Sequence, residues 1–162
     1  MRKFLSALTL MIALASVHTA MGKTPYMTSE ELQSESRRGF EEILDLWRDG
    51  RFEELYNRTM AGGRTSKEQF AKKLASAERK PACCWEKMQE VKVSVKNDST
   101  VTLRAKVGLE GGRAGTDYTT RSFRLQKEDG VWCISQSDIL SLAGAARKKT
   151  HHRTKKAKES NP

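Results

Sequence analysis

The apolar residues of this chain change their spacing at Pro81, and this change constrains the fold more than any other feature. Before Pro81 they recur at helical spacing, which is typical of helices with one buried stripe. After Pro81 they alternate with polar residues, which is typical of strands that bury one face and expose the other. The sequence therefore predicts an α+β domain in which helices cover the apolar face of an antiparallel sheet.

Three helices are expected before Pro81. They cover residues 30 to about 48, a short segment around 52–56, and a segment that starts after residue 66. Ser29 is expected to cap the first helix, and Asp49-Gly50 is expected to end it. Ser66 and Gln69 match a capping box at the start of the third helix.

About four strands are expected after Pro81. They cover residues 91–95, 101–109, 118–127 and 131–136. The segment 138–142 is expected to close the domain as a short strand extension or a turn of helix. Residues 147–162 contain no large apolar side chain and are expected to be disordered, because nothing offsets the entropy cost of ordering them.

Residues 1–22 have the build of a secretory signal. Arg2 and Lys3 form a short basic start, residues 4–17 are almost entirely apolar, and Ala20-Met21-Gly22 supplies a cleavage site. The apolar run is too short to be a spanning helix. We therefore expect a signal peptide (1–22), a single domain (23–146) and a basic tail (147–162), in a protein that is periplasmic or secreted.

Three cysteines lie in the expected domain, and an oxidising compartment favours a disulfide between two of them. Adjacent cysteines rarely bond to each other, so Cys133 is expected to pair with Cys83 or Cys84, and the choice between these two stays open. Such a bridge would close a loop of about 50 residues and contribute roughly 4 kcal/mol through chain entropy.

The positive charge is concentrated at the C-terminal end. The formal net charge is +10, and the tail holds seven basic residues against the single acidic residue Glu159. The basic residues of the tail are Arg147, Lys148, Lys149, Arg153, Lys155, Lys156 and Lys158. Such a cluster favours salt-dependent contact with an anionic envelope surface. No aromatic residue is interleaved with them, so specific recognition of nucleic acid is not expected.

Three segments share their pattern with one superfamily. They are Asp49-Gly50-Arg51-Phe52-Glu53-Glu54-Leu55-Tyr56, Ser66-Lys67-Glu68-Gln69-Phe70, and Phe123 to Ile134 with Lys127-Glu128-Asp129-Gly130 at its centre. Together they resemble the nuclear-transport-factor-2-like superfamily, in particular its small exported bacterial domains of unknown function, over about residues 36–142. The resemblance implies a cone, in which a curved sheet wraps around a long helix and can enclose a ligand cavity. One fold hosts enzymes, binders and interaction modules, so function does not follow from it.

No catalytic residue is expected. Enzymes of this superfamily place an inward Asp, often with Tyr or His, in the cone. The expected domain contains no histidine, because His18 lies in the signal and His151 and His152 lie in the tail. This removes the commonest general base and a His-rich metal site. Asp45 and Asp49 are expected on a solvated helix face and at the helix end. We therefore expect no metal and no cofactor.

Arg121 is the main candidate for ligand binding. It has the same strand parity as Phe123 and Leu125, so its charge is aimed at the buried face, where an unpaired charge is costly. Either it reaches water where the sheet splays, or it guards a cavity mouth and holds an anionic ligand. The candidate set is completed by Trp47, Tyr56 and Trp132. The two tryptophans are expected chiefly in the core.

The sequence favours an exported, non-enzymatic binding or interaction module. A cavity would take a small apolar or anionic ligand, or the open sheet face would pair with a protein, including a second copy of the chain. The alternative is an isomerase or dehydratase that uses the cone. That alternative requires an inward Asp within hydrogen-bond reach of Tyr56 or Tyr118.

Overall fold

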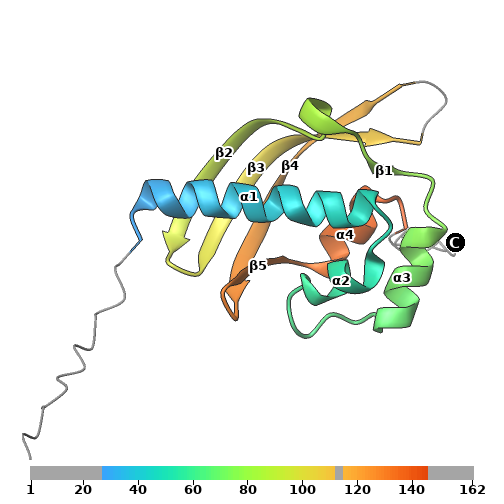
Figure 1. Ribbon diagram of the computed structural model, residues 1–162, viewed down its shortest axis with the longest axis horizontal. Coiled ribbons are helices and arrows are strands. Elements are labelled where there is room, and N and C mark those ends of the chain that lie inside the picture. Colours follow the sequence, from blue (N-terminus) through green and yellow to red (C-terminus); the bar gives the residue numbers. More distant parts are fainter. Residues whose placement is uncertain (1–26, 112–114, 146–162) are drawn as a thin grey trace, which may run out of the picture.

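The computed structural model describes residues 27–111 and 115–145 (Figure 1). These residues form a curved antiparallel sheet with helices packed against its inner face. The predicted α+β class is confirmed. The expected signal peptide and the expected basic tail both lie outside the described residues.

Helix α1 (Ser29–Arg48) is capped by Thr28, not by Ser29 as predicted. The Thr28 hydroxyl accepts a hydrogen bond from the Glu31 backbone amide at 3.2 Å, and the Glu31 carboxylate accepts one from the Thr28 amide at 2.7 Å. This reciprocal capping box satisfies two backbone donors. The helix therefore begins one residue earlier than predicted, and it ends at Asp49 as predicted.

Two shorter helices follow, α2 (Phe52–Asn57) and α3 (Lys67–Ala75), close to their predicted positions. The Ser66 hydroxyl accepts a hydrogen bond from the Gln69 amide at 3.3 Å, which is one half of the predicted capping box. The rings of Tyr56 and Phe70 meet edge to face, with 5.7 Å between their centroids. This aromatic contact packs α2 against α3.

The sheet has five strands in the described residues, in the order β1-β3-β4-β5, with β2 also paired to β3. The strands are β1 (Lys80–Pro81), β2 (Met88–Asn97), β3 (Thr100–Glu110), β4 (Asp117–Glu128) and β5 (Val131–Ile134). The four longer strands are those that the alternation predicts. The segment 138–142, which was expected as either a short strand extension or a turn of helix, belongs to helix α4 (Gln136–Leu142).

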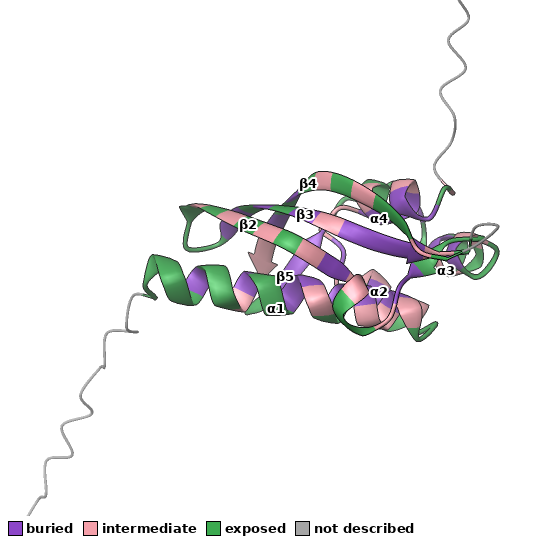
Figure 2. Cartoon of the chain, turned by 90° about the horizontal axis from the view of Figure 1, so that it is seen from above, coloured by how far each residue is buried: buried purple, intermediate pink, exposed green. Residues whose placement is uncertain are grey.

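The core lies between the inner face of the sheet and α1. The inward residues of β3, from Val101 to Leu109, are at most 1% exposed. The buried apolar stripe of α1 consists of Leu32, Phe40, Ile43, Leu44 and Trp47. The Phe40 and Phe123 rings lie 4.8 Å apart, so α1 is held directly on β4. Figure 2 shows buried positions as bands along α1 and over much of β3. Burying each large apolar side chain contributes about 1.5–3 kcal/mol.

Strand β2 forms one edge of the sheet in the part of the chain that the structure describes. Its register against β3 shifts between Gln89 and Lys92 and again between Val95 and Asn97. Such irregularities, together with lysines on an edge strand, hinder pairing with a strand of another chain. This edge is therefore a poor place for the second copy that the sequence leaves open.

Candidate anionic-surface interface

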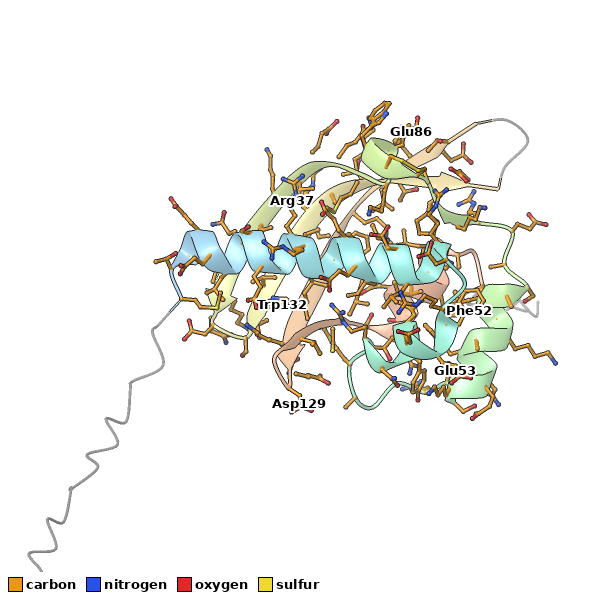
Figure 3. All side chains as sticks on the ribbon, in the orientation of Figure 1. Arg37, Phe52, Glu53, Glu86, Asp129 and Trp132 are labelled. Carbon is orange, nitrogen blue, oxygen red and sulfur yellow. A yellow bond between two sulfur atoms is a disulfide. The ribbon has the colours of Figure 1, made fainter. Side chains whose placement is uncertain are left out.

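The two tryptophans of the candidate ligand-binding set are core residues. Trp47 and Trp132 are each 2% exposed. Trp132 lies so close to Gly39 that a Cβ at that position would collide with the indole side chain. Figure 3 shows Trp132 beside α1, at the level of β5. Little of either indole is left for a ligand to stack on.

Tyr56 and Arg121 do not join the tryptophans around one cavity in the part of the chain described. Tyr56 is half-buried against Phe70. Arg121 faces the inner side of the sheet, as the strand pattern predicts, opposite Ala105. Its Nη1 donates a hydrogen bond to Ser141 Oγ in α4 at 2.9 Å. Helix α4 therefore gives this half-buried charge a polar partner.

Neither Tyr56 nor Tyr118 has a hydrogen bond to an aspartate within the described ranges. The Tyr118 hydroxyl instead donates to Glu86 Oε1 at 3.3 Å. Partial desolvation of the exposed phenol raises the pKa of Tyr118, and the negative charge of Glu86 raises it further. The hydroxyl therefore stays protonated at neutral pH and acts as a donor. The Asp–Tyr pair that the isomerase or dehydratase alternative requires is not assembled by these residues.

A pocket of about 430 Å³ lies between α1 and α2. Its lining residues are Glu42, Asp45, Leu46, Arg51, Glu54, Asn57 and Arg58. The ion pairs that hold its charged residues are Arg58 with Glu42 at 3.1 Å, Asp45 with Lys87 at 2.6 Å, and Arg51 with Glu54. The hydrogen bond from Arg51 lowers the pKa of Glu54. Because its charges are already paired, this pocket has little net field for a charged ligand.

The cysteines are arranged differently from the prediction. The sulfur atoms of Cys83 and Cys84 contact each other, whereas Cys133 is free and buried. The predicted bridge from Cys133 is not formed, because β1 pairs with the Leu109 end of β3, while β5 lies across β4 from the Val101 end. These ends are about 25 Å apart along the strand, and a disulfide needs Cα atoms within roughly 7 Å.

The outer face of the sheet, turned away from α1, carries three cross-strand rows of polar side chains. The rows are Ser94–Thr102–Arg124, Lys92–Arg104–Ser122 and Gln89–Lys106–Thr120, from β2, β3 and β4. We call these residues the outer grid. Neighbouring strands lie about 4.8 Å apart, and successive rows lie about 6.6 Å apart along β3 and β4. The outer grid contains basic, hydroxyl and amide side chains and no acidic one.

Three cations of the outer grid make no ion pair with any carboxylate that the structure describes. These are Lys92, Arg104 and Arg124, and all three are exposed. Lys106 differs, because its Nζ lies 3.6 Å from a Glu90 carboxylate oxygen. Lys92 and Arg104 are directly opposite each other. Like charges in this arrangement destabilise a sheet by roughly 0.2–1 kcal/mol.

A 3₁₀-helical turn, η1 (Cys84–Glu86), lies against the same face. A Cβ at Gly108, an outward position of β3, would collide with the Glu86 carbonyl oxygen. The Glu86 carboxylate accepts hydrogen bonds from Thr116 at 3.1 Å and from Tyr118 at 3.3 Å, both from the β4 side. Lys106 Nζ lies 4.7 Å from the centroid of the Tyr118 ring. The turn therefore adjoins the outer grid at Lys106.

Sequence reasoning assigned the anionic contact to the tail, whose basic residues lie outside the described ranges, and missed the outer grid. The alternation already placed Lys92 and Arg104 on the wet face of the sheet. It did not show that they are neighbours, because that depends on the register of β2 against β3.

Within residues 27–111 and 115–145, no group of His, Cys, Asp and Glu side chains is arranged to hold a metal ion. None of the helices in these ranges is long and apolar enough to cross a membrane. A comparison of the chain with models of known protein families found no match, and a comparison with curated proteins found none either. The outer grid, with its three exposed and unpaired cations, is the feature of the described residues that bears most directly on function.

Proposed function

We propose that this chain is an exported, non-enzymatic binding module that contacts an anionic envelope surface. The outer grid is the folded part of the contact, and the basic tail adds charge to it. The observation that carries the proposal is the group of unpaired cations Lys92, Arg104 and Arg124 on one exposed sheet face. A place in the nuclear-transport-factor-2-like superfamily is part of the same proposal, supported by the curved sheet packed on α1.

The repulsion between Lys92 and Arg104 gives an anionic partner an energetic advantage. In the free protein the two charges oppose each other across neighbouring strands. An anion between them replaces this repulsion with two attractions. Such a surface contributes chiefly to association rate and to the choice of partner, and its contribution falls as salt rises.

The other side chains of the outer grid suit oxyanion ligands. Arg104 and Arg124 can each give a carboxylate or phosphate two parallel hydrogen bonds. The hydroxyls of Thr102 and Ser122 lie directly beside them in the cross-strand rows. Cations interspersed with neutral donors can follow a surface on which negative groups repeat.

The tail is expected to strengthen this contact without specifying it. Its seven basic residues attract any surface of opposite charge. The outer grid adds charges whose spacing is fixed by the register of β2, β3 and β4. The outer grid and the tail therefore predict separable contributions to binding.

The proposal is tested by binding to immobilised dextran sulfate, a soluble polyanion, at low and at physiological salt. The double variant Lys92→Glu with Arg104→Glu is expected to bind at least about tenfold more weakly, a loss equivalent to ~1.4 kcal/mol. The matched control is Arg38→Glu with Lys72→Glu, which changes the net charge equally. Both control residues are exposed and lie on helices α1 and α3.

The control double variant is expected to lose less than about threefold, since its charges lie away from the outer grid. Equal losses in the two double variants would mean that net charge, and not the outer grid, determines binding. Circular dichroism spectra of both double variants check that the fold is retained.

A further inference from the structure

Trp85 is the most exposed of the large apolar side chains that the structure describes. It is 73% exposed, whereas Trp47 and Trp132 are each 2% exposed. It lies in η1, between Cys84 and Glu86. A tryptophan this exposed presents both its apolar ring and its N–H group to any surface that the protein meets.

The turn that carries Trp85 is fixed at one end of the outer grid. Glu86, the next residue, accepts hydrogen bonds from Thr116, just before β4, and from Tyr118 on β4. Tyr118 is itself exposed and contacts Lys106 of the outer grid through its ring. Figure 3 shows Glu86 on η1, far from the contact between Trp132 and α1. Two exposed aromatic residues therefore adjoin the basic grid.

We propose that the anionic surface is a lipid bilayer, and that Trp85 inserts into its headgroup region while the outer grid contacts lipid phosphates. This inference rests on the proposed function, which does not say what kind of anionic surface is bound, and it names that surface. Tyr118 lies at the boundary between the inserted turn and the grid, with its ring against Lys106.

The chemistry of the aromatic residues favours a bilayer over a soluble polymer. Trp and Tyr combine an apolar ring with a polar group, and both concentrate at the interface between membrane and water. Trp85 does not line the four pockets that lie between α1 and α2, between α3 and α4, beside residues 62–65 and beside Trp132. A sugar ring or a base held by stacking would be expected to meet a second wall there. An indole that is 73% exposed suits insertion between lipid headgroups.

An exposed tryptophan beside a basic surface also matches what stable contact with a membrane requires. A single weak anchor gives marginal and reversible binding, and a basic patch provides the second signal. Each Lys or Arg near an anionic bilayer strengthens binding by about fivefold, and the effect falls off within a Debye length. Lys92, Arg104 and Arg124 supply such charges on the folded domain, and the tail supplies others.

The test uses the purified chain, tail included, with vesicles of phosphatidylcholine alone or mixed with phosphatidylglycerol. Binding is measured by co-sedimentation, and insertion by the tryptophan emission spectrum and by quenching with brominated lipid. Since Trp47 and Trp132 are buried, a change in emission reports on Trp85. We expect a blue shift and quenching with the mixed vesicles, and neither with phosphatidylcholine alone.

Trp85→Ala is expected to abolish the blue shift and to weaken vesicle binding by about fivefold or more, while binding to dextran sulfate is unchanged. The matched control is Val131→Ala, which removes another exposed apolar side chain, at 42% exposure. The control is expected to keep both the blue shift and the vesicle binding.

Three results would overturn the inference. These are vesicle binding that is unaffected by Trp85→Ala, a blue shift of the same size with dextran sulfate, and equal binding to both kinds of vesicle. In the first two cases the proposed function still stands if Lys92→Glu with Arg104→Glu weakens binding to dextran sulfate. If that double variant has no effect on dextran sulfate either, the proposed function fails as well.

Discussion

Lys92 and Arg104 lie directly opposite each other on β2 and β3, both exposed, and neither pairs with a carboxylate in the described part of the chain. A sheet selected only for stability would place an acidic or neutral residue at one of these positions. Functional surfaces often retain local arrangements that reduce stability. The pair is therefore the point at which stability and binding are expected to conflict.

Replacing Arg104 by Thr is expected to stabilise the protein and weaken its binding to anions. The substitution removes the repulsion with Lys92 and introduces a residue that suits a strand, so the free energy of unfolding should rise by a few tenths of a kcal/mol, to about 1 at most. Urea unfolding and dextran sulfate binding measure the two effects. Lys106→Thr is the matched control and should give no such gain, because Lys106 pairs with Glu90. A loss of stability in Arg104→Thr would contradict the repulsion.

Gly108→Ala is expected to displace η1. The added Cβ would overlap the Glu86 carbonyl oxygen, which is backbone and cannot swing away. The free energy of unfolding should fall by about 1–3 kcal/mol, as for other cases of overpacking. Emission from Trp85 and its quenching by acrylamide should change with it. Ser122→Ala, on the same face but away from η1, should leave both unchanged. A Gly108→Ala protein of unaltered stability would show that the turn is not seated on β3.

The N-terminal cap of α1 distinguishes Thr28 from Ser29. Thr28→Ala is expected to cost about 1 kcal/mol of unfolding free energy, and Ser29→Ala close to none. Hydrogen bonds from Thr28 hold the pKa of Glu31 below its ordinary value of 4.5. The ionised Glu31 carboxylate therefore stabilises the folded state fully above pH 4.5, and this stabilisation is lost as the pH falls through the lowered pKa. Unfolding curves between neutral and acid pH measure it. Equal costs for the two alanine variants would contradict the capping box.

Cys133 is expected to be the unbonded thiol and to be unreactive in the folded protein. Burial raises the pKa of its thiol above the ordinary value of 9.0, and the negative charge of Glu128 raises it further. The folded state therefore holds this proton more tightly than the unfolded state. The resulting stabilisation is complete below pH 9.0 and is lost as the pH rises through the raised pKa.

Alkylation with iodoacetamide followed by peptide mapping tests this assignment. Without reductant, Cys133 should be labelled in denaturant and protected in the native protein. Cys133→Ala should remove the part of the alkaline pH dependence of stability that the thiol causes. Rapid labelling of native Cys133 would contradict its burial, and no labelling in denaturant would indicate a bridge from Cys133 to another cysteine.

The periodic segments of this protein could be predicted from the sequence. The stripe of α1 and the alternation of β3 are strong local patterns, and their positions in the structure match them closely. The inward direction of Arg121 followed from the same alternation. Its partner could not be predicted, because Ser141 lies in α4 and is brought to Arg121 by the tertiary fold.

The segment between Pro81 and Met88 shows where local patterns end. The Ala82 amide donates to the Gly108 carbonyl at 2.9 Å, and the Glu86 carboxylate accepts hydrogen bonds from Thr116 and Tyr118. These contacts join residues far apart in the chain. No repeating pattern of apolar residues in the sequence predicts them. The position of Trp85 beside the outer grid could therefore not be predicted from the sequence. The burial of Trp47 and Trp132 in the core was expected, because both fall in periodic apolar segments.

The outer grid can be tested directly by recording backbone amide chemical shifts of isotope-labelled protein while dextran sulfate is added. We expect the largest changes in the folded domain at Lys92, Arg104 and Ser122, which form the central row, and at their neighbours in β2, β3 and β4. The changes should reverse when salt is added. Changes confined to residues 147–162, or centred on the pocket between α1 and α2, would contradict the outer grid as the binding surface.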